Sequence, residues 1–173
     1  MDVKQTILFK FYNLNLFFLC YNNYMKKILL ATDHAGFEIK EKTIEILKNN
    51  NLEFEDFGAF EYNLDDDYPD FISQVAEKIS GNSNEYLGII FGGSGQGEAI
   101  TANRFKNIRA IVYYGFEKEI LKLSKDHNNA NVLSIGARFI KEEDLEDIIL
   151  TWINEKFSKK ERHQRRIEKI EKN

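Results

Sequence analysis

Short apolar runs and amphipathic stretches alternate along the chain from residue 25 onward. The apolar runs predict five strands, at residues 26–33, 52–58, 86–93, 108–114 and 131–136. Apolar positions at helical spacing predict helices at residues 36–51, 68–80, 98–105, 117–127 and 142–157. Because strands that alternate with helices are typical of βα units, we expect an α/β protein: a three-layer α/β/α sandwich around a five-stranded parallel sheet.

The last segment, residues 159–172, is helical by propensity but has almost no apolar face. It carries seven Lys or Arg residues against three Glu. A helix this polar needs a partner, such as another subunit or an anionic ligand; a solvated tail is the alternative. No aromatic residues interleave the basic ones, which argues against nucleic-acid binding. We therefore expect one domain at residues 25–157 and a basic C-terminal helical extension at residues 158–173.

Residues 1–24 differ from the rest of the chain because they are rich in aromatic residues and asparagine. Their apolar run is broken by Asn13 and Asn15 and is shorter than the roughly 20 residues that cross a bilayer. No small-residue cleavage site follows it, and this disfavours an export signal. We expect a disordered extension or one read from an upstream start codon, with Met25 as the functional start.

Size and charge narrow the functional classes further. At 173 residues and 43% hydrophobic positions, the chain can bury one substantial core. A net charge of -4 argues against a protein whose whole surface binds nucleic acid. The single cysteine, Cys20, cannot form an internal disulfide, and no set of His, Cys, Asp and Glu has metal-ligand spacing. We predict a cytoplasmic protein that binds neither a metal, nor nucleic acid, nor a membrane.

A glycine-rich loop follows the third predicted strand, in the sequence FGGSGQGE. It is no dinucleotide fingerprint, because Glu98 stands where the last glycine of G-x-G-x-x-G belongs, and no Walker loop, because G-K-[ST] does not follow. A tight turn with Glu98 beside a helix start is one alternative. Four glycines in six residues favour instead a nest of backbone N–H groups that holds an anionic oxygen.

A second polar group, in the sequence DHAGFE, ends the first predicted strand. Taken alone, Asp33 fits a helix cap as well as a functional residue. His34 could likewise be an ordinary surface histidine. The carboxyl ends of parallel strands meet at one edge of a sheet. We therefore expect Asp33, His34 and the glycine loop to face one crevice.

Two further groups lie nearer the C-terminus. His127 and Asn128 end a predicted helix, where a structural turn is the alternative; a histidine there has its protonated form favoured and suits a proton donor. Arg162 and Arg166 lie at i and i+4, on one helical face. An anion between them would relieve their repulsion, and arginine forks suit phosphate oxygens.

Five motifs, in the order DHAGFE, GGSGQGE, ANRF, DHNNANVLSIGAR and RHQRRI, resemble those of the ribose-5-phosphate isomerase B family, which also contains galactose-6-phosphate isomerase subunits. The resemblance covers residue 25 to about residue 169. It implies a Rossmann-like subunit and a homodimer or tetramer. It also implies interconversion of ribose 5-phosphate and ribulose 5-phosphate through a cis-enediolate, without metal or cofactor. The polarity of the C-terminal helix favours a site shared between subunits, with a site completed within its own subunit as the alternative.

The resemblance assigns roles around the sugar ring to four residues. Asp33 and His34 are implied to contact the sugar. His127 is implied to help open the furanose ring as a proton donor, with Asn128 as a binding residue.

The same resemblance assigns the phosphate and oxyanion sites. The phosphate ligands are implied to be Arg138, Arg162 and Arg166, with His163 nearby. The developing oxyanion is implied to lie in the glycine loop, where the Ser94 hydroxyl assists. The members of that loop are Gly93, Ser94, Gly95, Gln96 and Gly97.

The base that moves a proton between C2 and C1 differs within the family. One branch has a cysteine immediately before the glycine loop, where this chain has Gly92. Another has a glutamate just after the loop, which matches Glu98. Isomerisation needs such a base together with donors aimed at the oxygen where charge develops. We therefore expect Glu98 to be the base, with burial raising its basicity and the helix dipole opposing the rise.

Three other functions remain open at this stage, the last of them nucleic-acid binding through the basic C-terminal segment. The same proton transfer would serve a six-carbon substrate such as galactose 6-phosphate or allose 6-phosphate. A flavodoxin-like module that only binds a phosphorylated ligand is the second alternative. A base opposite a proton donor argues against the pure binding module.

Overall fold

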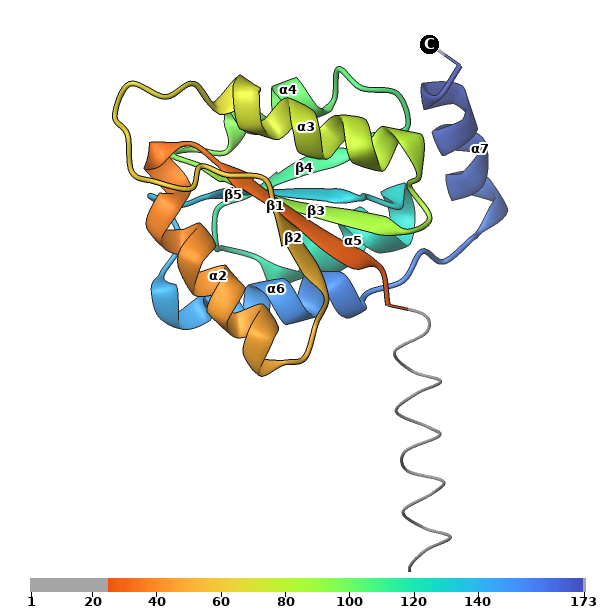
Figure 1. Cartoon of the computed structure of the whole chain (residues 1–173). Helices are drawn as coiled ribbons and strands as arrows, with labels where there is room; N and C mark the ends of the chain where they lie inside the picture. Colours follow the sequence, from red (N-terminus) through yellow and green to blue (C-terminus); the bar gives the residue numbers. More distant parts are fainter. Residues whose placement is uncertain (1–24, 173) are drawn as a thin grey trace, which may run out of the picture.

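Five parallel strands form the centre of the structure, a computed structural model that describes residues 25–172. The strands are β1 (Lys27–Thr32), β2 (Phe54–Asp56), β3 (Tyr86–Gly92), β4 (Ala110–Tyr113) and β5 (Val132–Gly136). Their order across the sheet is β2-β1-β3-β5-β4, and every neighbouring pair is parallel. The predicted five-stranded parallel sheet is thus confirmed (Figure 1). The extension expected at residues 1–24 lies outside the described residues.

Helices cover both faces of the sheet. They are α2 (Phe37–Asn49), α3 (Tyr68–Gly81), α4 (Gln96–Ala102), α5 (Lys118–Asn128), α6 (Leu145–Asn154) and α7 (Glu161–Ile170), with short 3-10 turns η1 (His34–Gly36) and η2 (Glu142–Asp144). Figure 1 shows α3 and α4 on one face and α2 and α6 on the other, which confirms the three layers. No helix within residues 25–172 is long and apolar enough to cross a membrane.

Each face of the sheet has its own hydrophobic cluster, because successive side chains of a strand point to opposite faces. Ile28 and Leu30 of β1 pack into the cluster that includes Trp152 of α6, whereas Leu29 and Ala31 pack into the cluster under α3. All five side chains are almost fully buried. A sheet covered on both faces explains why its central strands have nearly continuous apolar sequences.

The C-terminal helix α7 differs from its prediction. His163 and Ile167, four residues apart, are both buried where α7 packs against α5. An ion pair of 2.5 Å between Arg109 and Glu171 adds to this contact. The expectation that this helix has almost no apolar face was therefore too strict, because two buried positions suffice to dock it on its own subunit.

Candidate active site

The carboxyl ends of β1 and β3 lie side by side where the strand order changes direction. Open α/β sheets bind ligands at such switch points. The polar turn after β1 is held close to β3 by Gly36. A Cβ on Gly36 would lie 2.4 Å from Thr32 Oγ1 and 2.5 Å from Phe91 Cβ, so only glycine fits there without a shift. The turn that carries Asp33 and His34 is thereby brought against the glycine loop.

The glycine loop turns sharply from β3 into α4. Gly95 has a φ of 73°, which favours glycine, and its carbonyl accepts a 2.6 Å hydrogen bond from Ser134 Oγ. As a result α4 begins at Gln96, two residues before its predicted start. Within residues 25–172, the backbone N–H groups of Gly93, Ser94 and Gly95 have no hydrogen-bond acceptor. Three successive free donors form a nest that can hold an anionic oxygen.

Glu98 lies in the first turn of α4 and is only 4% exposed. Its carboxylate lies over Gly92, where a Cβ would come 1.8 Å from Oε1. Burial raises the pKa of Glu98 above its ordinary value; its own backbone N–H opposes the rise, and the negative charge of Asp33 adds to it. Burial therefore outweighs the opposing hydrogen bond, and a more basic carboxylate is suited to accept a proton near neutral pH.

Arg138 follows β5 and lies at the same edge of the sheet. Its guanidinium is close to Gly93, because a Cβ on Gly93 would lie 3.0 Å from Arg138 Cζ. The backbone N–H of Arg138 donates a 3.2 Å hydrogen bond to the carbonyl of Gly93. The Arg138 side chain is exposed and is thus free to bind an anion beside the loop.

Side chains of the loop itself complete its outer wall. Ser94 Oγ accepts a 3.3 Å hydrogen bond from the backbone N–H of Gln96, whose side chain is hydrogen-bonded to Tyr114. Tyr68 of α3 covers Gly97, with its ring carbon Cζ 2.6 Å from the place of a Cβ there. A larger residue at position 97 would push this tyrosine away from the loop.

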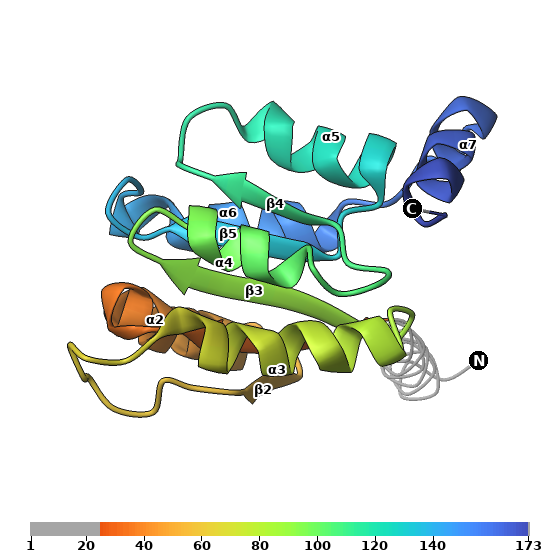
Figure 2. The same cartoon turned by 90° about the horizontal axis from the view of Figure 1, so that it is seen from above.

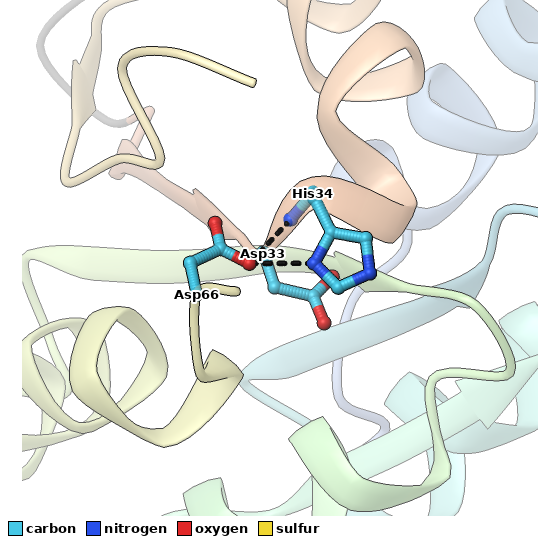
Figure 3. Close-up of side chains that lie close together, drawn as sticks. All are labelled: Asp33, His34 and Asp66. Atoms are coloured by element: carbon cyan, nitrogen blue, oxygen red, sulfur yellow. Dashed lines mark hydrogen bonds and ion pairs between the residues drawn. The ribbon is translucent and has the colours of Figure 1, made fainter. Parts of the chain in front are cut away.

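His34 is held by a residue that the sequence analysis did not select, Asp66 in the acidic turn before α3 (Figure 3). Asp66 Oδ1 lies 3.0 Å from the backbone nitrogen of His34 and 2.6 Å from its Nδ1. Asp33 is buried, and its carboxylate accepts a 2.9 Å hydrogen bond from the N–H of Ala35. The predicted capping role of Asp33 is therefore present, and the residue also lies at the site.

Asp33, His34 and Asp66 are the residues within 25–172 that could hold a metal ion, since each offers a ligand atom within 4.8 Å of the others. The imidazole Nδ1 and the Asp66 carboxylate are already hydrogen-bonded to each other. A cation bound through these two groups would have to replace that hydrogen bond. The three residues therefore form a hydrogen-bonded group, and a metal is not needed to explain it.

The other predicted residues gather where α5 ends and α7 begins. The ring of His127 lies 4.2 Å from that of His163, centroid to centroid, and its carbonyl is 3.2 Å from His163 Nδ1. Arg162 Nε donates a 2.7 Å hydrogen bond to His163 Nε2. Asn128 and Arg166 are exposed beside them. This second group combines two histidines, one of them buried, with an amide and two arginines.

His163 is neutral in this arrangement. Its Nε2 accepts a hydrogen bond from Arg162, so Nδ1 carries the ring proton and donates to the carbonyl of His127. Burial lowers the pKa of His163, and the charges of His127 and Arg162 act in the same direction, against the hydrogen bond to the His127 carbonyl. The buried ring thus orients Arg162 and is itself almost inaccessible, at 1% exposed.

The two groups lie at opposite edges of the sheet. The chain between α5 and β5 is at the amino edge, where Asn131 N donates to Arg109 O before β4 and Asn131 O accepts from Gly88 N. The glycine loop is at the carboxyl edge. Five residues of β5, at about 3.3 Å each, separate the edges by roughly 16 Å. Figure 2 shows α7 beyond the end of the sheet from which the strands start.

The structure therefore brings together only part of the predicted site within one subunit. At the carboxyl edge lie Asp33, His34, Gly93, Ser94, Gly95, Gln96, Gly97, Glu98 and Arg138. At the amino edge lie His127, Asn128, Arg162, His163 and Arg166. The α7 helix of a subunit does not reach the glycine loop of the same subunit.

Comparison with known families and proteins points to one family. The family model described as Ribose/Galactose Isomerase matches residues 28–170. Ribose-5-phosphate isomerase B of Mycobacterium leprae is 37% identical over 142 residues, which cover 82% of this chain and 86% of that protein. The Escherichia coli protein of the same name is 36% identical over 146 residues, covering 84% of this chain and 95% of its own length.

Solved structures agree with the sequence comparison. A Mycoplasma genitalium ribose-5-phosphate isomerase B, crystallised with bound ribulose 5-phosphate, has a TM-score of 0.80 and 35% identity, covering 84% of this chain and 94% of its own. A ribose 5-phosphate isomerase of Thermotoga maritima has a TM-score of 0.79 and 37% identity, covering 86% and 99%. The described fold, the motifs and these matches lead to one conclusion: the chain belongs to the ribose/galactose isomerase family.

Proposed function

We propose that this enzyme interconverts ribose 5-phosphate and ribulose 5-phosphate, with Glu98 as the base. The observation that carries the proposal is the buried Glu98 carboxylate next to a loop with three backbone N–H groups that have no acceptor in the described part of the chain. An isomerase of this type needs a proton acceptor and an oxyanion site within reach of two adjacent carbons. The relatives named above are ribose-5-phosphate isomerases, and this supports the choice of substrate.

In the proposed reaction Glu98 takes the proton from C2 of the open-chain aldose. The negative charge that develops on the carbonyl oxygen at C1 is stabilised by the N–H groups of Gly93, Ser94 and Gly95. Glu98 then returns its proton to C1, and the proton of the C2 hydroxyl passes to the oxygen at C1, so that C2 becomes the ketone and C1 carries the hydroxyl group. The raised pKa of Glu98 supports this role because it makes the carboxylate a stronger acceptor.

The proposal includes a homodimer, or a tetramer built of such dimers, in which two subunits share each site. A subunit supplies Glu98 and Arg138 at its carboxyl edge, and its partner supplies His127, Arg162 and Arg166 from its amino edge. The support is the split of the residues between opposite edges, since a single subunit cannot unite them. In this assembly His127 protonates the ring oxygen of the furanose, and the arginines bind the phosphate.

Turnover on a series of aldose phosphates tests the proposal. The full chain is assayed with ribose 5-phosphate, allose 6-phosphate and galactose 6-phosphate, and ketose formation is followed directly. We expect the highest kcat/KM with the five-carbon sugar. A preference for a six-carbon sugar would keep the mechanism but replace the substrate, and binding without turnover of any of them would reject the enzyme.

We place the reaction in the cytoplasm, in keeping with a chain that has a single cysteine.

A further inference from the structure

Within residues 25–172, the side-chain carboxylate of Asp66 is hydrogen-bonded only to His34. Its Oδ1 accepts from both the backbone N–H and the ring Nδ1 of His34, at 3.0 and 2.6 Å. Its Oδ2 is buried and has no hydrogen-bond partner within residues 25–172. The Asp66 side chain is only 8% exposed, so this carboxylate is withdrawn from water, and no lysine or arginine of the described part of the chain forms an ion pair with it. Asp33 also lies nearby, but His34 is the hydrogen-bond partner of this carboxylate within the described residues, so its role is to be sought in what it does to His34.

We propose that Asp66 is a positioning residue: it fixes the ring orientation and the proton position of His34 for contact with the sugar. This rests on the proposed function for the role of His34, but the geometry of the pair is independent of it. Asp66 itself does not touch the reacting atoms. It acts through the imidazole, as carboxylates do that orient a ligating or catalytic histidine.

The direction of the hydrogen bond decides the tautomer. A carboxylate only accepts hydrogen bonds, so the 2.6 Å contact places the ring proton of His34 on Nδ1. Figure 3 shows the other ring nitrogen, Nε2, turned away from Asp66. Nε2 has no partner within the described residues. In the neutral ring it is therefore a free acceptor for a sugar hydroxyl, on the side of the ring not occupied by Asp66.

The surroundings of His34 limit the ring in a second way. Tyr62, in the same loop as Asp66, meets the imidazole edge to face with centroids 6.2 Å apart. Tyr62 also packs edge to face with Phe37 at the start of α2. The loop before α3 thus contacts His34 through an aromatic ring and through a carboxylate. Of the two, only the carboxylate accepts a hydrogen bond from the ring and so determines which nitrogen carries the proton.

Nitrogen NMR of the histidine rings tests the tautomer without reference to activity. The chain has three histidines, so a His34→Gln variant assigns the His34 signals by their loss. In the wild type we expect the proton of the neutral ring on Nδ1. In Asp66→Ala the proton should move toward Nε2, because the acceptor that holds it is gone. An unchanged His34 tautomer in Asp66→Ala would overturn the proposal even if the protein proves to have another substrate.

Kinetics on ribose 5-phosphate test the consequence. Asp66→Ala should lower kcat/KM by about 10- to 100-fold, the range for loss of an orienting partner. Asp66→Asn keeps an acceptor oxygen and the shape of the side chain, so its kcat/KM should fall less. This variant replaces Asp66→Ala in the test if the alanine variant folds poorly. Asp65→Asn is the matched control, since Asp65 is exposed in the same loop, and it should retain wild-type kinetics.

A double variant separates positioning from a general structural effect. In a His34→Gln background, Asp66→Ala should cause no further loss, because its effect passes through the imidazole. If the two losses add up, Asp66 does not act through His34. The proposal is also rejected if the His34 tautomer changes in Asp66→Ala while kcat/KM stays at the wild-type value. Absence of isomerase activity in the wild type itself would reject the proposed function, whereas the NMR result would still decide the Asp66–His34 pairing.

Discussion

The carboxylate of Glu98 occupies the space where a side chain on Gly92 would begin. A Cβ at position 92 would lie 1.8 Å from Oε1 and 2.1 Å from Cδ of Glu98. Real Cβ atoms do not approach other atoms so closely, and the glutamate is too tightly buried to move without leaving its place. Glycine before the loop and glutamate after it are therefore one structural unit. Any side chain at position 92, a cysteine included, would therefore displace the carboxylate that we propose as the base.

The first prediction concerns Gly92→Ala. The added methyl group should displace the Glu98 carboxylate and lower kcat at least 100-fold, because a shift of about 1 Å in a catalytic group can have that effect. Gly81→Ala is the control, since a Cβ at Gly81 meets nothing within 4 Å. Steady-state kinetics of both variants, with circular dichroism to verify the fold, make the comparison. Wild-type kcat in Gly92→Ala would mean that the position of Glu98 is not critical.

The second prediction concerns the charge of Glu98. Glu98→Gln should lower kcat by about 10²- to 10⁴-fold, the contribution of a positioned general base, while the Kd for ribose 5-phosphate changes little. Burial raises the pKa of Glu98, so in the wild type the acid limb of kcat/KM should lie above pH 4.5. Calorimetric titration and pH–rate profiles measure the two quantities. A variant that keeps near-normal kcat would remove Glu98 from the mechanism.

The third prediction concerns the stability of the same variant. Folding raises the pKa of Glu98, so between its unfolded and its folded pKa the native state binds more protons than the unfolded state. The contribution of Glu98 to stability therefore falls as the pH rises through that window. Glu98→Gln lacks this loss and should have a higher Tm than the wild type at pH 7, with a smaller difference at pH 4. Glu45→Gln, exposed on α2, should show neither effect. A lower Tm of Glu98→Gln at pH 7 would contradict the burial argument.

The fold could be predicted because its determinants are local. The apolar run at residues 86–93 and the helical spacing at residues 68–80 lie within one element each, and both elements form as expected. The start of α4 was missed by two residues, since the left-handed turn at Gly95 decides it. The small apolar face of α7 was missed because one of its two buried residues is His163, which hydropathy counts as polar.

The site could be predicted only in part, because its geometry depends on contacts between distant segments. Glu98 was selected from its place after the glycines, but its packing over Gly92 is a property of the folded turn. Asp66 was missed because it is one of three successive aspartates in an exposed-looking turn, and only the approach of His34 distinguishes it. The separation of His127 from the loop does follow from topology, since a helix that precedes a parallel strand ends at the amino edge of the sheet.

The fourth prediction tests whether sites are shared between subunits. Glu98→Gln chains and His127→Gln chains should each be nearly inactive, but after joint refolding about one quarter of the wild-type activity should return. Half of the random dimers are mixed, and each mixed dimer has one site of two with both wild-type residues. As the control, Glu98→Gln mixed with Asp33→Asn should give no recovery, because both residues come from the same edge of one subunit. No recovery in the first mixture would place the whole site in one subunit.

The fifth prediction concerns Lys125 of α5, which is 6% exposed and lies 3.9 Å from the ring centroid of Trp152. Burial, with the nearby charges of Lys26 and Arg109, lowers the pKa of Lys125 to about 7, against 10.5 for an ordinary lysine. Between these values the unfolded chain holds a proton that the folded chain releases, so stability rises with pH. The ring of Trp152 favours the charged form and offsets part of this effect.

Measurement of that pH dependence requires a variant that cannot titrate. Relative to Lys125→Met, the wild type should gain about 2 kcal/mol in free energy of unfolding from pH 7 to pH 9, since each pH unit in the window contributes up to about 1.4 kcal/mol. Urea unfolding at the two pH values gives this difference. Lys122→Met, on the exposed side of the same helix, should follow the wild type at both. Parallel stability curves for wild type and Lys125→Met would show that Lys125 stays protonated, and that its contact with Trp152 outweighs its burial.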